Sequence, residues 1–213
     1  MVTSSNPVIE VFADIWCPFA HVGLRTVEHQ RILTGRTDVA IRVRAWPLEL
    51  VNGAPLDPAT TRTHVIHLRE QVAPMMFTNF TVDRFPTSTL NALSLVERAY
   101  RTDLHLGERT SFFLRDALFE RGQDISDQEI LRDAIAQLGL EIPDEFDRAA
   151  VLAGWHEGQE RGVRGSPHLF CGEADSFCPS LHITNDPEHG VAIQLDTSRL
   201  AGFLEECLAR TAR

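Results

Sequence analysis

The residues best suited to chemistry lie near the start of the chain, around a single cysteine. Cys17 stands in the run Asp14-Ile15-Trp16-Cys17-Pro18-Phe19-Ala20-His21, and a cysteine thiolate attacks disulfides and electrophiles. His21 follows four residues later, a spacing that puts two side chains on one face of a helix. An imidazole there can lower the pKa of a thiol or move a proton. The motif predicts a reactive Cys17 assisted by His21; the alternatives are a small buried cysteine and a packed histidine.

The elements that flank Cys17 favour a thiolate. Val8–Asp14 is an apolar, alternating run that predicts a strand. Pro18 suits the first position of a helix, where a missing N–H costs nothing, and the helix is predicted over Pro18–Leu33. Free backbone N–H groups and the helix dipole favour negative charge at such a strand-to-helix switch. We therefore expect the pKa of Cys17 to be lowered.

Ala20 occupies the place at which a second cysteine would complete a C-x-x-C pair. A two-cysteine cycle within the motif is therefore impossible. The remaining route is attack by Cys17 on a disulfide or an electrophile, and a small thiol such as glutathione or mycothiol then releases the mixed disulfide. Cys171 and Cys178 are further candidates for that release, with burial in a hairpin as the alternative, whereas Cys207 is expected in the core.

The other candidate ligands do not predict a metal site. The four cysteines are irregularly spaced and contain no C-x-x-C pair, so we expect neither a disulfide framework nor structural zinc. His64 and His67 are three residues apart and lack a nearby carboxylate or thiol, so they are interpreted as surface histidines. No tightly bound cofactor is predicted.

Composition and charge exclude several classes of partner. The 213 residues are 43% hydrophobic and 23% charged, as in an ordinary globular protein. A net charge of −10 argues against nucleic acid, and the scattered arginines form no patch for a membrane surface. The first seven residues do not resemble a signal peptide, and no apolar run approaches the ~18 residues of a spanning helix. The expected location is the cytoplasm, where thiols stay reduced.

Strand and helix signals divide the chain into three zones. Residues 1–51 contain the strand and helix around Cys17 and a second alternating strand, Val39–Trp46. Residues 52–161 carry almost no strand signal and predict four or five helices. In residues 162–213 the run His168–Cys171 is expected to pair with Val191–Leu195.

Several helix ends are also predicted. One helix is expected to start at Asp57-Pro58, and Ser126-Asp127-Gln128-Glu129 is a capping box before a helix that ends at Gly139. Another is expected from Pro143-Asp144 to about Arg161, and Thr197 or Ser198 can cap a closing helix that runs to about Arg210. The order is β-α-β, helices, β-β-α, which predicts an α/β domain of residues 1–51 and 162–213 with an all-helical insertion at 52–161.

This order, with Trp16-Cys17-Pro18 near one end and Gly165-Ser166-Pro167 near the other, resembles the DsbA-like thioredoxin superfamily. The chain is most similar to the branch that contains FrnE, 2-hydroxychromene-2-carboxylate isomerases and kappa-class glutathione transferases. The resemblance covers nearly the whole chain and implies a thioredoxin fold interrupted by a helical domain. Further matching runs are Trp46-Pro47-Leu48, Gly122-Gln123-Asp124-Ile125-Ser126-Asp127 and Gly162-Val163-Arg164-Gly165-Ser166-Pro167.

The resemblance also implies roles for individual residues. Cys17 matches the family's nucleophile, and Ser166-Pro167 matches the cis-proline dipeptide whose backbone pairs with an incoming peptide or thiol. Ala20 departs from the oxidoreductases, which carry a resolving cysteine there. The isomerase and transferase branch commonly has serine at the nucleophile position and relies on bound glutathione. The residues expected to bind substrate are Trp16, Pro18, Phe19, Ala20, Ser166, Pro167 and His168.

Three functions follow as hypotheses. The first is a thiol-disulfide oxidoreductase with Cys17 as its single nucleophile, exchanging with a small thiol in a cleft between the fold and the helical insertion. The second is a glutathione-dependent isomerase or transferase acting on an aromatic small molecule. The third is a non-catalytic binding module that has kept the fold. A homodimer is compatible with each of them.

Overall fold

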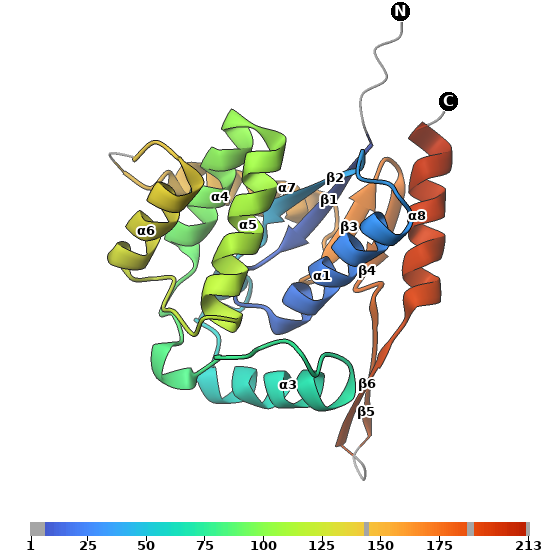
Figure 1. Cartoon of the computed structure of the whole chain (residues 1–213), viewed down its shortest axis with the longest axis horizontal. Helices are drawn as coiled ribbons and strands as arrows, with labels where there is room; N and C mark the ends of the chain where they lie inside the picture. The colour runs from blue at the N-terminus through green and yellow to red at the C-terminus, as the bar shows by residue number, and fades with distance from the viewer. Residues whose placement is uncertain (1–6, 143–144, 187–189, 212–213) are drawn as a thin grey trace, which may run out of the picture.

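Strands from both ends of the chain form one sheet, and the helices between them pack around it (Figure 1). The computed structural model describes residues 7–142, 145–186 and 190–211. The elements in chain order are β1 (Val8–Ala13), α1 (Pro18–Leu33), β2 (Ala40–Ala45), α2 (Leu48–Val51), α3 (Pro58–Gln71), the 3₁₀ helix η1 (Val82–Arg84), α4 (Leu90–Thr102), α5 (Leu104–Phe119), α6 (Gln128–Leu138), α7 (Arg148–Glu160), β3 (His168–Cys171), β4 (Ala174–Phe177), β5 (Leu181–Asp186), β6 (Gly190–Leu195) and α8 (Thr197–Thr211).

The main sheet has the strand order β2-β1-β3-β4. Strand β1 runs parallel to β2, with Val11 opposite Val43, and antiparallel to β3, with Val11 opposite Leu169. The parallel pair requires a crossover, which α1 provides. The predicted β-α-β start is confirmed. Strands β1 and β2 each begin and end within one residue of the positions predicted from the sequence.

The C-terminal strands pair differently from the prediction. Strand β3 pairs with β4, a strand that was not predicted from the sequence. Gly172 has φ +60°, a conformation that glycine adopts without strain, and it lets the chain reverse directly after β3. The predicted strand Val191–Leu195 forms within β6, but its partner is β5 in a separate two-stranded sheet. The polar run of β4 gave no periodic signal for a strand.

Side-chain caps set the helix starts. Asp57 accepts a hydrogen bond from the Thr60 N–H and starts α3 as predicted. At α6 the cap is Asp127 rather than Ser126, and Gly139 at φ +67° ends the helix. Helix α7 starts at Arg148, and the predicted start at Pro143-Asp144 lies outside the described residues. Helices α2 to α7 all fall between β2 and β3, as an inserted helical segment requires. The boundaries at residues 52 and 161 stay a prediction.

Both faces of the sheet are covered. Val11 and Phe12, on opposite faces of β1, are both fully buried, as in a strand that lies between two layers. On one face Phe12, Trp46 and Phe170 form a small aromatic cluster beneath α7. Gly158 of α7 permits this packing, because a Cβ there would lie 2.6 Å from the Trp46 ring. None of the helices in the described residues has the length and apolar character needed to cross a membrane.

The outer edge of β2 is completed by side chains of α4 and α5 rather than by another strand. Tyr100 Oη accepts from the Val43 N–H at 2.9 Å and donates to the Ile41 carbonyl at 3.0 Å. Glu108 Oε2 accepts from the Ile41 N–H at 3.0 Å, and Glu97 Oε1 from the Ala45 N–H at 3.2 Å. Three N–H groups and one carbonyl on this edge of β2 are therefore bound without a further strand.

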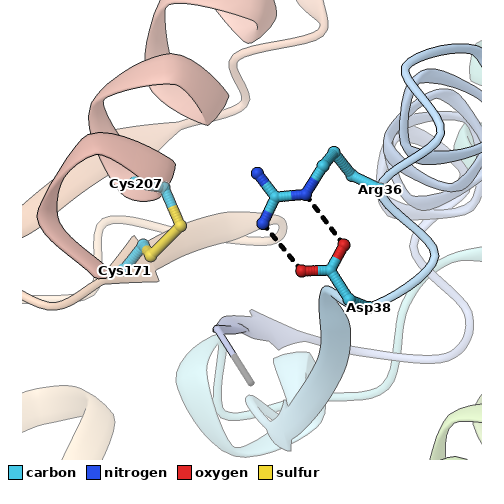
Figure 2. The surroundings of a disulfide bond; sticks show 4 residues. All are labelled: Arg36, Asp38, Cys171 and Cys207. Atoms are coloured by element: carbon cyan, nitrogen blue, oxygen red, sulfur yellow. Dashed lines mark hydrogen bonds and ion pairs between the residues drawn. A yellow bond between two sulfur atoms is a disulfide. The ribbon is translucent and has the colours of Figure 1, made fainter. Parts of the chain in front are cut away.

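A disulfide joins Cys171, at the end of β3, to Cys207 in α8, with a Cα–Cα distance of 5.4 Å. Figure 2 shows it with the surrounding Arg36–Asp38 ion pair, whose Nη2–Oδ2 distance is 2.8 Å. The bond corrects the prediction that Cys171 is available to react with Cys17, and it is a single disulfide in a sequence whose cysteine spacing predicted no disulfide framework. The two cysteines are 36 residues apart, so only the docking of α8 against the sheet brings them together.

Candidate functional site

A cleft of about 280 Å³ opens at the N-terminus of α1. One wall comes from the motif around Cys17 and from Ser166, which precedes β3. The opposite wall comes from α2 and from the segment that enters and begins α3. The residues that line it are Cys17, Pro18, Phe19, Leu48, Leu56, Asp57, Thr60, Thr61, His64 and Ser166.

Cys17 is the N-cap residue of α1, and its side chain is almost buried, at 4% exposure. Its Sγ–H donates to the Ser166 carbonyl at a sulfur–oxygen distance of 3.2 Å. Burial raises the pKa of the thiol. Hydrogen bonds from the Ser166 side chain and the Ala20 N–H, together with the charge of Arg115, offset only part of that rise. The predicted lowering of this pKa is therefore wrong, because removal from water outweighs the helix N-terminus.

The Ser166–Pro167 peptide bond is cis. Ser166 Oγ accepts from the Asp14 N–H at 3.0 Å, which connects this dipeptide to the segment before Cys17. Pro167 is buried against α1 at Gly23, where a Cβ would lie 3.3 Å from the proline Cγ. The structure thus brings together two segments about 150 residues apart in sequence, as the resemblance predicted.

Two oppositely charged residues are buried beneath the cleft. Burial raises the pKa of Asp14 to about 6, although its Oδ2 accepts from the Leu48 N–H at 2.5 Å. Burial lowers the pKa of Arg115 to about 10, and this residue donates to the Asp14 carbonyl at 2.7 Å. The charge of Arg115 lowers the pKa of Cys17 and that of Asp14 raises it. Arg115 was missed in the sequence because an arginine within a helix ordinarily faces solvent.

His21 is not part of the cleft. Its Nε2 lies 2.8 Å from Glu120 Oε1, and its ring packs between those of Phe77 and Phe119. Burial lowers the pKa of His21, which favours a neutral ring. Spacing along the helix correctly predicted that His21 is near the first turn, but the ring is directed to Glu120 rather than to the thiol.

Trp16 and His168 are also placed away from the cleft. Trp16 is fully buried and stacks on Phe85 with a centroid distance of 5.7 Å. His168 Nε2 lies 2.7 Å from Asp175 Oδ1, and its ring contacts Phe170. Strand alternation explains the latter, because Pro167 faces α1 and the next residue points to the opposite side of the sheet. Both residues are buried against other aromatic rings, and neither lines the cleft.

A cleft between the sheet domain and the helical insertion is present as predicted, but the residues of α2 and α3 that line it were not predicted. His64, expected at the surface, lines the cleft with its ring centroid 5.0 Å from that of Phe19. Partial burial lowers the pKa of His64, so a neutral ring is favoured. Leu48 and Leu56 add apolar surface beside it. The start of α3 at Asp57 was predicted from the sequence, but the position of this helix beside Cys17 depends on tertiary packing.

Pro18, Phe19 and Ser166 line the cleft, whereas Ala20 is buried in the first turn of α1. Cys178 is a free, buried cysteine whose backbone N–H donates to the Pro167 carbonyl at 2.9 Å. No group of three or more histidine, cysteine, aspartate or glutamate residues is arranged to hold a metal ion in the part of the chain that the structure describes.

Most of the chain matches one known protein family. Residues 8–185 match the family described as the DSBA-like thioredoxin domain. No curated protein sequence matches the chain.

Three solved structures share the fold. A Nitrosomonas europaea protein assigned as a disulfide isomerase is 19% identical, with a TM-score of 0.66 over 96% of this chain and 98% of its own. The cytosolic disulfide reductase DsbM from Pseudomonas aeruginosa, solved with GSH, is 15% identical, with a TM-score of 0.57 over 95% and 99%. A 2-hydroxychromene-2-carboxylate isomerase is 14% identical, with a TM-score of 0.54 over 97% and 96%.

Proposed function

The chain belongs to the DSBA-like thioredoxin domain family, and from that premise we propose that it catalyses thiol–disulfide exchange with Cys17 as the nucleophile. One observation carries the proposal. The Cys17 Sγ lies at the N-terminus of α1, 3.2 Å from the Ser166 carbonyl, in a cleft large enough for a small molecule. A nucleophilic sulfur that lines a cleft open to a small molecule is what such an exchange needs.

The exchange proceeds in two balanced steps. The Cys17 thiol loses its proton, and the thiolate attacks one sulfur of a disulfide, which forms a mixed disulfide and releases the other sulfur as a thiolate. A thiol then attacks the substrate sulfur of the mixed disulfide, leaves with it as a new disulfide and regenerates the Cys17 thiol. Because Ala20 carries no sulfur, the motif itself supplies no such thiol, and we assign the reducing equivalents to a small molecule such as glutathione or mycothiol.

The shape of the cleft supports a small substrate. Its volume of about 280 Å³ is near the lower end of the range for ligand pockets. Phe19, Leu48 and Leu56 supply apolar surface, and Thr60 and His64 supply polar groups. We propose a small disulfide or a mixed disulfide with a small thiol as substrate. We propose the cytoplasm as the compartment, which the cytosolic assignment of the Pseudomonas reductase supports.

One feature favours a second function, a glutathione-dependent isomerase or transferase acting on an aromatic small molecule. Burial raises the pKa of Cys17, and its Sγ–H donates a hydrogen bond. A neutral thiol of this kind can orient a bound glutathione as a serine hydroxyl would, without forming a disulfide. The solved 2-hydroxychromene-2-carboxylate isomerase shares the fold.

Replacement of Cys17 by serine separates these functions. We expect Cys17→Ser to reduce the glutathione-dependent reduction of bis(2-hydroxyethyl) disulfide to the uncatalysed rate, because a hydroxyl does not exchange with disulfides. Mass spectrometry of the wild type with oxidised glutathione should show an adduct on Cys17. Full activity in Cys17→Ser would contradict the proposal. Saturable binding of reduced glutathione without any adduct would favour the isomerase or transferase. An unreactive Cys17 without glutathione binding would favour a non-catalytic binding module.

A further inference from the structure

Cys178 is a second free cysteine beside the candidate site, and the function proposed above does not use it. It follows β4 directly and is 7% exposed. Its backbone N–H donates to the Pro167 carbonyl at 2.9 Å, while Cys17 Sγ–H donates to the carbonyl of the preceding residue, Ser166, at 3.2 Å. The two cysteines are therefore bound to consecutive residues of the same dipeptide.

The pairing of β3 with β4 indicates which face Cys178 occupies. His168 is opposite Phe177, so the next residue pair outward is Pro167 with Cys178. Opposed residues of antiparallel strands present their side chains to the same face. Pro167 packs against Gly23 of α1, the helix that begins immediately after Cys17. In agreement, Cys17 and Cys178 belong to the same cluster of buried residues, separate from the aromatic cluster on the other face.

The backbone at Cys178 has φ +46°, which is uncommon for a residue with a side chain. A glycine would adopt this conformation more easily. Strained backbone of this kind concentrates at functional sites. The positive φ therefore indicates a functional role for Cys178, independently of the hydrogen bonds.

The two thiols also interact electrostatically. Burial first, and then the negative charge of the Cys17 thiolate, raises the pKa of Cys178 to about 12. A Cys17 sulfur within a disulfide carries no charge, so the second cause disappears once a mixed disulfide has formed. Burial, the larger cause, remains, so only a small fraction of Cys178 is ionised at neutral pH, and the placement of Cys178 beside the dipeptide carries the argument.

We propose that Cys178 resolves the mixed disulfide on Cys17, in place of the second cysteine that the motif lacks at Ala20. This inference rests on the exchange proposed for Cys17. The Cys178 thiolate attacks the Cys17 Sγ, a Cys17–Cys178 disulfide forms, and the substrate sulfur leaves as a thiolate that takes up a proton. Two molecules of a small thiol then reduce the internal disulfide and leave as their own disulfide. The sum remains the reduction of one disulfide by two thiols.

The other two cysteines, Cys171 and Cys207, are not available to resolve a mixed disulfide on Cys17. Cys171 is at the far end of β3, three residues beyond His168, and is bonded to Cys207 in α8. The Cys171–Cys207 disulfide, which attaches α8 to the sheet, would therefore be separate from the proposed Cys17–Cys178 disulfide at the cleft.

The test uses oxidised glutathione as both substrate and oxidant. The full chain is mixed with it, quenched with N-ethylmaleimide at intervals, digested without reduction and analysed by mass spectrometry. In the wild type we expect a transient glutathione adduct on Cys17, followed by a linked Cys17–Cys178 peptide. In Cys178→Ser and Cys178→Gly the adduct should persist, on the order of tenfold longer or more, because the neighbouring thiol is gone. The glycine variant suits the positive φ, so it keeps the test valid if serine disturbs folding.

The variant Cys171→Ser/Cys207→Ser is the matched control. It lacks the structural disulfide but keeps both site cysteines, and it should form the Cys17–Cys178 link as the wild type does. Loss of the link in this control would overturn the proposal, because the link would then require exchange through Cys171 or Cys207. An adduct equally long-lived with and without Cys178 would also overturn it, while exchange at Cys17 would stand. No adduct and no link in any variant would refute both proposals.

Discussion

At the scale of single residues, Cys17 lines a cleft, but the burial of its side chain disfavours the charged thiolate. Burial raises the thiol pKa, and two buried charges act on it in opposite directions, Arg115 lowering it and Asp14 raising it. Reactivity at neutral pH is therefore limited by the small fraction of thiolate. Removal of the Asp14 charge should raise the thiolate fraction without any change to Cys17 itself.

Alkylation of Cys17 by iodoacetamide should respond to pH and to Asp14 in defined directions. Because the pKa is raised above its ordinary value of 9.0, we expect the rate to keep rising through pH 9 without a plateau at neutral pH. Asp14→Asn keeps an acceptor for the Leu48 N–H but removes the negative charge. The rate at pH 8 should then increase by about threefold to tenfold.

Peptide mass spectrometry measures these rates separately for Cys17 and Cys178, and thermal unfolding checks that Asp14→Asn is folded. A plateau below pH 8 in the wild type would contradict the effect ascribed to burial. An unchanged rate in Asp14→Asn would show that the carboxylate charge does not act on the thiol.

At the scale of elements, the edge of β2 depends on side chains from the inserted helices. Tyr100 is the central one, because its hydroxyl serves both a donor and an acceptor of the strand. Gly107 of α5 makes room for it, since a Cβ there would overlap the Tyr100 ring. The sequence shows the helical spacing around Tyr100, but it gives no sign that the hydroxyl binds a strand.

Removal of the Tyr100 hydroxyl should weaken this edge. Tyr100→Phe leaves the Val43 N–H and the Ile41 carbonyl without that partner, which should lower the free energy of unfolding by about 1–3 kcal/mol. Glu97→Gln keeps an acceptor oxygen for the Ala45 N–H and should cost less. Urea unfolding at pH 7 measures both. Equal stability of Tyr100→Phe and wild type would mean that the strand backbone is satisfied in another way.

At the scale of the whole molecule, the disulfide ties the C-terminal helix to the sheet across 36 residues. Cross-linking a loop of this length restricts the unfolded chain, so Cys171→Ser/Cys207→Ser should lose about 3–4 kcal/mol of unfolding free energy. Chemical denaturation of the variant and of the oxidised wild type provides the comparison, with reduced wild type as a control. Coincident unfolding curves would show that α8 is held by packing alone. Both sulfurs are buried, which hinders attack by small thiols on the folded protein.

Local patterns predicted much of this architecture and less of the site. The alternation in β1 and β2, Pro18 at the start of α1 and Gly139 at the end of α6 are local signals, and each is present in the structure. Of the two halves of the site, Cys17 was found from its local sequence and Ser166 through the resemblance. Arg115 and His64 were missed, because their positions at the cleft depend on how distant helices pack. Such long-range packing leaves no periodic trace in one sequence.

The completed edge of β2 has a consequence for attempts to simplify this protein. A shortened chain that keeps only the β-α-β and β-β-α parts would lose α4 and α5, and with them the groups that bind the Ile41, Val43 and Ala45 backbone. The uncovered strand would be a template for pairing with other chains, and such edges promote self-association. Excision of the helical segment would therefore remove a wall of the cleft and also the protection of the sheet against aggregation.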